Sequence, residues 1–188
     1  MRGMLPISVV VPVRNEAANI ARCLGALGNR FAEVLVVDSQ STDDTCRIAE
    51  QHGARVVQFA WDGHFPKKRN WVLRNVELQS EWVLFIDADE CVTESFVNGV
   101  SRVLPIAACV GFWLTYRNAF MGSWLRFGDP FRKLALFRRD AGEYERIDDE
   151  GWSCLDMEVH EHPVLAGALG CIRSAIEHRD FKGMDAYQ

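Results

Sequence analysis

Short apolar segments alternate with amphipathic segments along the first half of the chain. Residues 7–13, 33–38, 54–59 and 82–87 are short, apolar and rich in β-branched or aromatic side chains, which is typical of strands buried on both faces. The segments between them place apolar residues on one side, as amphipathic helices do. Strands and helices in this order predict an α/β fold with a mostly parallel sheet and helices on both faces.

The expected helices begin at residues that suit a helix N-terminus. Asn15, Ser41 and Thr93 have side chains that can accept a hydrogen bond from a free N–H group of the first turn. Pro66 suits the first turn of the third helix, which is expected to end near Leu78.

The pattern changes beyond Pro105. Residues 110–116 and 133–137 are expected to be strands, and the links between them are rich in aromatic and basic residues. No internal repeat and no linker divides the chain. We therefore expect a single domain over residues 1–188, in which residues 106–188 form a smaller mixed region.

The composition is that of an ordinary globular protein. Of the 188 residues, 48% are hydrophobic and 25% are charged, and 21 basic against 26 acidic residues give a net charge of −5. This balance argues against a nucleic-acid-binding protein, which would be basic. No apolar run approaches the roughly 20 residues of a membrane-spanning helix, and no signal peptide is recognised. We expect a cytoplasmic protein whose six cysteines are reduced, since the chain is not small and shows no secretion signal.

Aspartates stand at the ends of two predicted strands. Asp38 closes the second strand, and Asp87, Asp89 and Glu90 place three acids within four residues after the fourth. Ligands of open α/β sheets bind beyond this edge, and clustered carboxylates repel one another unless a cation compensates them. If Asp87 and Asp89 face the same side, one Mg²⁺ or Mn²⁺ could join them to a diphosphate. The alternative is a solvated turn that caps the following helix.

Four segments in this order and spacing resemble glycosyltransferase family 2 with the GT-A fold: VVPVRNE (10–16), VDSQSTDDT (37–45), KRN (68–70) and WVLFIDADE (82–90). Later segments resemble the subgroup that adds sugars to bacterial lipopolysaccharide core or exopolysaccharide: LFRR (136–139), VHE (159–161) and IEH (176–178). The resemblance implies a metal-dependent, inverting transferase. Its donor would be a nucleotide-sugar, a UDP-hexose, and its acceptor a saccharide or a lipid-linked saccharide.

The resemblance also assigns roles to individual residues. Asp87 and Asp89 would be the Asp-x-Asp that binds the metal and the diphosphate, and Asp38 would pair with the base. Arg69 would lie near the base or the diphosphate. The other residues expected to shape the nucleotide pocket are Pro12, Asn15 and Glu16.

The catalytic base of the family is a carboxylate on the acceptor side. We place it at Glu161, in the Val-His-Glu segment, with Asp156 as the second candidate. Such a base removes the proton of the acceptor hydroxyl as it attacks the sugar. Members of the subgroup usually continue well past the region of His178, so we expect a chain that is naturally short or truncated on the acceptor side.

Aromatic and basic residues interleave from Trp113 to Arg139. Such side chains stack on sugars, pair with acceptor phosphates or rest on a membrane surface, so a peripheral contact with the inner face of the cell membrane is one hypothesis. The alternative is that Phe112, Trp113 and Phe137 belong to the core.

Two other functions stay open at this point. A sugar nucleotidyltransferase would share the sheet and the acidic site, but its glycine-rich N-terminal loop is missing here. A catalytically inactive donor-binding subunit, completed by a partner, would keep the donor site without transfer. The oligomeric state is not indicated by the sequence.

Overall fold

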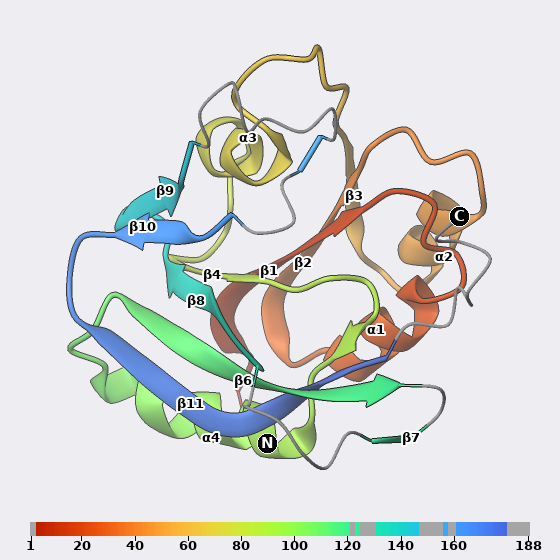
Figure 1. Ribbon diagram of the computed structural model, residues 1–188. Coiled ribbons are helices and arrows are strands. Elements are labelled where there is room, and N and C mark those ends of the chain that lie inside the picture. Colours follow the sequence, from red (N-terminus) through yellow and green to blue (C-terminus); the bar gives the residue numbers. More distant parts are fainter. Residues whose placement is uncertain (1–2, 121–122, 125–130, 147–155, 158–160, 180–188) are drawn as a thin grey trace.

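The computed structural model describes residues 3–120, 123–124, 131–146, 156–157 and 161–179 (Figure 1). The first half alternates strands and helices: β1 Leu5–Val13, α1 Ile20–Leu27, β2 Phe31–Asp38, α2 Thr45–Gln51, β3 Arg55–Gln58, α3 Lys68–Asn75 and β4 Trp82–Phe85. It is followed by β5 Glu90–Cys91, α4 Glu94–Val103, the 3₁₀ turn η1 Leu104–Ile106, β6 Gly111–Phe120, β7 Ser123–Trp124, β8 Phe131–Arg138, β9 Gly142–Tyr144, β10 Pro163–Leu165 and β11 Leu169–His178.

One curled sheet runs through the molecule in the strand order β3-β2-β1-β4-β8-β6-β11-β5, and β7 pairs with the end of β6 (Figure 1). The strands β3, β2, β1 and β4 are parallel to one another. β8 is antiparallel to β4 and β6, whereas β11 is parallel to β6 and antiparallel to β5. The expected α/β fold, with a parallel first half and a mixed second region, is therefore confirmed.

Helices cover both faces of the parallel strands. Side chains alternate between the two faces of a strand, so neighbouring residues of β1 belong to different cores. Val9 shares one core with Ile20 of α1 and Phe96 of α4, whereas Val10 shares the opposite core with Val72 of α3. Because both faces are covered, the strands are continuous apolar runs, which is the pattern that the sequence shows.

The first predicted helix start is wrong. Asn15 has a φ of 54° and precedes α1, which begins at Ile20 after Asn19. The Asn15 side chain instead turns toward the loop after β2, where its Oδ1 accepts a hydrogen bond of 2.8 Å from the Thr42 amide. Its amide in turn donates to Ser41 Oγ at 2.7 Å. The Asn15 side chain, which could cap a helix, instead joins the loop after β1 to the loop after β2.

The other helix starts agree in part with the prediction. Thr93 caps α4, because its hydroxyl accepts a hydrogen bond of 3.1 Å from the Phe96 amide. Pro66 lies two residues before α3, and this helix ends at Asn75 rather than near Leu78. Leu78 is nevertheless buried in the same core as α3, so its apolar character reflects packing of the following loop.

A buried polar network connects β1, β2 and β3 with the segment that precedes β4. Glu33 of β2 accepts hydrogen bonds from Ser8 Oγ at 2.7 Å and from the Gln79 amide at 3.0 Å, and it pairs with Arg55 at 3.2 Å. Ser8 Oγ also accepts a hydrogen bond of 3.1 Å from the Ser80 amide. The network ties β1, β2 and β3 to the chain entering β4, so we assign it a structural role.

The aromatic residues of the interleaved segment divide between core and surface. Phe112 and Phe137 are buried and Trp113 is half-buried, whereas Phe131 is 49% exposed. Within the described ranges, no helix has both the length and the apolar character needed to cross a bilayer. The cysteines of these ranges are free thiols, as expected, and Cys154 lies outside them.

Candidate functional site

The carboxyl ends of β1 and β4 lie next to each other at the point where the strand order of the sheet reverses. From β1 the chain moves outward through β2 to β3, and it returns to β4 on the other side of β1. Open α/β sheets bind ligands in the crevice at such a switch point. The first turn of α3 reaches this edge, since Lys68 Nζ donates to the Val13 carbonyl oxygen at 3.1 Å.

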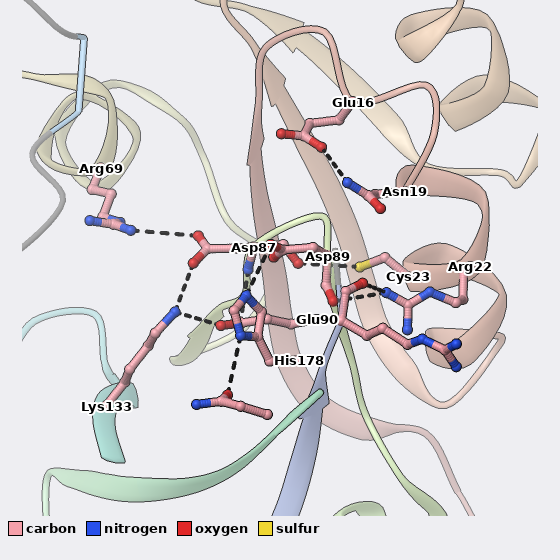
Figure 2. Close-up of polar contacts among 12 residues, drawn as sticks. Glu16, Asn19, Arg22, Cys23, Arg69, Asp87, Asp89, Glu90, Lys133 and His178 are labelled. Atoms are coloured by element: carbon pink, nitrogen blue, oxygen red, sulfur yellow. Dashed lines mark hydrogen bonds and ion pairs between the residues drawn. The ribbon is translucent and has the colours of Figure 1, made fainter. Parts of the chain in front are cut away.

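Two of the three acids after β4 share one lysine (Figure 2). Lys133 Nζ of β8 lies 2.8 Å from Asp87 Oδ2 and also contacts Glu90 Oε1. Burial and the neighbouring charge of Asp87 raise the pKa of Glu90 to about 7, against the effect of Lys133. Burial also acts to raise the pKa of Asp87, but Lys133 and Arg69 hold it below its ordinary value. Asp87 is thus ionised near neutral pH, and Glu90 is the acid of the pair that can retain a proton.

Arg69 links the acids to a carboxylate from the second half of the chain. Its Nη1 lies 2.9 Å from Glu161 Oε1 and its Nη2 lies 3.6 Å from Asp87 Oδ1. The guanidinium also lies over the Tyr144 ring, 5.1 Å from its centroid. Only 4% of the Glu161 side chain is exposed, so this carboxylate is held in place by a charge-assisted hydrogen bond.

Asp89 faces a histidine at the end of β11 (Figure 2). His178 Nε2 lies 3.0 Å from Asp89 Oδ2, and its Nδ1 lies 3.2 Å from Asn118 Oδ1 of β6. The hydrogen bond to Asp89 raises the pKa of His178, against the effect of burial. Because both ring nitrogens face oxygen atoms, a proton or another cation is needed between Nε2 and Asp89. Figure 2 shows Asp87, Asp89 and His178 close together, and the charge of His178 acts to lower the pKa of Asp87.

A cavity of about 170 Å³ opens beside these groups. Its lining combines charged side chains with aromatic ones: Arg69, Asp87, Glu90, Lys133 and Glu161 on one hand, and Phe85, Phe131 and Tyr144 on the other. The nearby hydroxyl of Tyr116 is buried and has no hydrogen-bond partner among the residues that the structure describes. Burial, together with the charges of Glu90 and Asp87, raises the pKa of Tyr116. A small cavity with polar groups and aromatic walls suits a hydroxyl-rich ligand.

The loop after β2 is folded onto the loop after β1. Asp38, which is 1% exposed, accepts a hydrogen bond of 3.0 Å from the Ser41 amide on Oδ2 and another from Ser41 Oγ on Oδ1. Burial acts to raise the pKa of Asp38, but these hydrogen bonds hold it below its ordinary value. The Glu16 amide donates to Thr45 Oγ1 at 2.8 Å, and Pro12 lies in β1 beside β2. Asp38 thus orders its own loop, and its pairing with a base stays a prediction.

Asp156 lies at the ends of β1 and β2. Its Oδ2 lies 2.9 Å from Lys68 Nζ and accepts a hydrogen bond from Ser39 Oγ. Its carbonyl oxygen accepts a hydrogen bond of 2.9 Å from the Lys68 amide at the start of α3. Burial acts to raise the pKa of Asp156, but the contacts with Ser39 and Lys68 hold it below its ordinary value.

The structure therefore brings the predicted residues together in two groups. Around the acids after β4 lie Arg69, Asp87, Asp89 and Glu161. At the ends of β1 and β2 lie Pro12, Asn15, Glu16, Asp38 and Asp156. Asp156, the second candidate for the base, contacts the second group instead of joining Glu161. The catalytic and binding roles of all these residues stay predictions.

Two residues beside the acids were not assigned roles from the sequence. Lys133 stood in the segment of interleaved aromatic and basic residues, where nothing distinguished it from the other cations. His178 stood in the Ile-Glu-His segment that carried the resemblance, and this was the available signal. Their distances from Asp87 and Asp89 in the sequence, 46 and 89 residues, hide both contacts from local pattern analysis.

Comparisons with known proteins identify relatives of this chain. The sequence model of Glycosyl transferase family 2 matches residues 8–142. The lipopolysaccharide core biosynthesis glycosyltransferase LpsC of Rhizobium meliloti is 26% identical over 178 residues, which cover 90% of this chain and 61% of LpsC. An uncharacterized glycosyltransferase of Rickettsia felis is 45% identical over 100 residues, which cover 53% of this chain and 34% of that protein.

A solved structure shows the same likeness. The crystal structure of S. aureus TarS in complex with UDP-GlcNAc superposes with a TM-score of 0.54 at 26% identity, over 68% of this chain and 37% of that one. The chain thus spans between about a third and three fifths of the length of these relatives. Because the sequence model of the family matches residues 8–142, which is most of the chain, the protein belongs to glycosyltransferase family 2.

Proposed function

We propose that the chain binds a nucleotide-sugar, a UDP-hexose, in the crevice between β1 and β4 and transfers the sugar to a saccharide or lipid-linked saccharide with inversion. The observation that carries this proposal is the convergence of Asp87, Asp89 and His178 beside the Arg69–Glu161 pair at the switch point of the sheet. TarS, a structural relative, was crystallised with UDP-GlcNAc, which supports the choice of a UDP-sugar as donor.

The chemistry of the side chains fits a divalent cation. Asp87 and Asp89 offer carboxylate oxygens, which Mg²⁺ and Mn²⁺ prefer, and His178 Nε2 faces Asp89 with its other nitrogen oriented by Asn118. Among the described residues, no three acidic, histidine or cysteine side chains are arranged to surround an ion without help. Mg²⁺ commonly completes such a shell with water and substrate phosphates. When bound, the ion would supply positive charge that stabilises a diphosphate leaving group.

Lys133 and Arg69 would add positive charge beside the diphosphate. The ammonium of Lys133 and the guanidinium of Arg69 are fixed by the acids beside the crevice, so their orientation is set before any substrate arrives. Preorganised positive charge of this kind stabilises negative charge that develops on a leaving group. Lys133 also lies 2.8 Å from Asp87, and we propose that it keeps the acids together until the donor complex binds.

Glu161 is our candidate for the catalytic base. It lines the same cavity as Asp87 and Lys133, and Arg69 holds one of its oxygens at 2.9 Å. A carboxylate in this position could accept the proton of an acceptor hydroxyl as that hydroxyl attacks the anomeric carbon from the side opposite the diphosphate. General base catalysis of this kind contributes about 10²–10⁴-fold to a rate.

The acceptor and the pathway are proposed from the relatives. LpsC, which matches 90% of this chain, is described as an enzyme of lipopolysaccharide core biosynthesis. We propose a related role in bacterial cell-surface polysaccharide synthesis, in the cytoplasm and at the inner face of the membrane where lipid-linked acceptors lie. Phe131, which lines the cavity and is 49% exposed, is suited to stack on an acceptor sugar or to touch that surface.

The proposal is tested by titrating UDP into the protein with Mn²⁺, and again with EDTA, in an isothermal calorimeter. We expect Mn²⁺-dependent UDP binding in the wild type and its loss in Asp89→Ala, with the circular dichroism spectrum unchanged. Asp140→Asn, which alters an exposed acid in the turn after β8, is the control and should bind like the wild type. Equal affinity of Asp89→Ala and the wild type would refute the metal assignment.

A second assay separates transfer from its alternatives. Release of UDP from UDP-glucose, with or without an acceptor saccharide, shows turnover. Binding with no hydrolysis and no transfer would instead support an inactive donor-binding subunit. Formation of a UDP-sugar from UTP and a sugar phosphate would support a nucleotidyltransferase, which the family assignment does not favour.

A further inference from the structure

The helix α1 contacts the main chain of both aspartates after β4. Arg22 and Cys23 are consecutive in α1, and Figure 2 shows them beside the loop that carries Asp87 and Asp89. Arg22 Nη2 donates a hydrogen bond of 2.9 Å to the Asp89 carbonyl oxygen. The Cys23 thiol contacts the Asp87 carbonyl oxygen, with 3.8 Å between sulfur and oxygen. Because α1 contacts the backbone here, the carboxylates of both aspartates are left for other partners.

The same nitrogen of Arg22 also holds the end of β11. Nη2 donates to the carbonyl oxygen of Arg179, the residue that follows β11. The Arg179 amide in turn donates to the Asp89 carbonyl oxygen at 3.0 Å, so the three residues form a closed ring of hydrogen bonds. His178, whose Nε2 lies 3.0 Å from Asp89 Oδ2, directly precedes Arg179. The ring therefore joins the two main chains that carry Asp89 and His178.

The strand pairing at this point is short. β5 has two residues, and each pairs with one residue of β11: Cys91 with Glu177 and Glu90 with His178. Strands of globular proteins usually have about 3–10 residues, so this pairing contributes few hydrogen bonds. The contacts of Arg22 extend the connection past its last pair.

α1 is a rigid support for the Arg22 contacts. The buried residues of this helix belong to the core that also contains Ile176 of β11; they are Ile20, Cys23, Leu24 and Leu27. Side chains in a close-packed core have little freedom to move, so the helix backbone is firmly placed. Arg22 is itself half-buried, and two carbonyl oxygens orient its guanidinium. The position of Nη2 is therefore well determined.

We propose that Arg22 is a positioning residue of the donor site, which sets the spacing between Asp89 and His178 so that the pair can hold a divalent cation. This inference rests on the proposed binding of a donor together with such a cation. Residues that orient metal ligands typically contribute about 10–100-fold to metal affinity.

The charge of Arg22 gives the proposal a test by sign. A positive charge close to a cation site repels the cation, so its removal by itself would strengthen cation binding. Loss of the correct spacing between Asp89 and His178 would weaken cation binding instead. Arg22→Met removes the charge and the hydrogen bonds together, and the direction of the change in affinity shows which effect is larger.

The first experiment is titration of Mn²⁺ into Arg22→Met in the presence of UDP, with free Mn²⁺ followed by electron paramagnetic resonance. We expect the affinity for Mn²⁺ to fall by at least about tenfold relative to the wild type. The matched control is Arg30→Met. Arg30 Nε also donates to a carbonyl oxygen, that of Leu27 at 3.2 Å, but its ion pair is with Glu94, whose side chain is 80% exposed. This variant should bind Mn²⁺ like the wild type.

The second experiment is amide hydrogen exchange of the nucleotide-free protein, followed by NMR. In Arg22→Met the Arg179 amide should exchange at least about tenfold faster, because the Asp89 carbonyl that it contacts is no longer held by α1. The Val97 amide, which donates to the Thr93 carbonyl in α4, is the internal reference and should change less. If Arg22→Met does not fold, Arg22→Lys replaces it. This variant keeps the charge on a shorter side chain, and it should lower the affinity for Mn²⁺ by at least about threefold.

The outcomes separate this inference from the proposed function. If the wild type shows no Mn²⁺-dependent binding of UDP, the proposed function fails and this inference fails with it. If the wild type binds and Arg22→Met binds Mn²⁺ equally well or more tightly, the positioning role is wrong while the function stands. Equal acceleration of the Arg179 and Val97 amides would show a general loss of stability, and it would also overturn the positioning role.

Discussion

The pair formed by Arg69 and Glu161 allows a stability prediction that follows from burial. Arg69→Met leaves Glu161, whose side chain is 4% exposed, without its 2.9 Å contact. Removing one partner of a buried ion pair costs about 3–5 kcal/mol, because the other charge stays buried. Asp87 should add little, since its 3.6 Å contact is longer, its side chain is 34% exposed and it keeps Lys133. We expect a loss of about 3–5 kcal/mol in the free energy of unfolding at pH 7.

Urea unfolding, followed by circular dichroism, measures this loss. The matched control is Arg74→Met on the same helix, which breaks a contact with Glu143 in which both side chains are more than 40% exposed, 43% and 41%. Exposed pairs contribute about 0–1 kcal/mol, so the control should change little. The double variant Arg69→Met/Glu161→Gln should lose at least about 1 kcal/mol less than the sum of the single variants. Additive effects, or equal losses in Arg69→Met and Arg74→Met, would show that the pair is not a buried ion pair.

Three further predictions concern separate parts of the molecule. Glu161→Gln should keep UDP affinity within about threefold but lower the transfer rate by at least about a hundredfold, because an amide cannot act as a base. A coupled UDP-release assay measures this rate, and a normal rate would place the base elsewhere. Glu33→Gln should lower the free energy of unfolding by about 1–3 kcal/mol, because the NH₂ group that replaces Oε1 cannot pair with Arg55, although the amide oxygen can keep the hydrogen bonds from Ser8 and Gln79. Urea unfolding measures this change, and an unchanged midpoint would contradict it. The pKa of Asp156 is lowered from 3.8 in the folded chain, so its contribution to stability is present above about pH 4 and is lost as the pH falls through the folded-state pKa. Asp156→Asn should therefore flatten the fall of stability below about pH 4 in urea titrations, and an equal slope in both proteins would argue against the ion pair.

The parallel half of the sheet could be predicted because its signals are local. Strands covered on both faces are continuous apolar runs, and the residues that close them, such as Asp38, stand at the edge that binds ligands. The start of α1 was predicted wrongly because an asparagine that caps a helix and an asparagine that joins two loops look alike in a sequence. Asn15 does the second, and only the fold shows it. Its backbone, with a φ of 54°, follows from packing against the loop after β2.

The partners of the acids could not be predicted, because they depend on which strands become neighbours. Lys133 reaches Asp87 only because β8 pairs antiparallel with β4, and His178 reaches Asp89 only because β11 pairs with β5. The contact of Asp156 with Ser39 joins residues 117 positions apart. Such pairings are set by the topology of the whole sheet, whereas motif spacing is informative only within one loop.

The position of a bound nucleotide tests the account most directly. In crystals grown with UDP and Mn²⁺, we expect an anomalous manganese peak within coordination distance of Asp89, with the diphosphate between β1 and β4 and the uracil ring toward the ends of β1 and β2. Manganese density elsewhere, or a nucleotide bound outside this crevice, would contradict the proposed donor site.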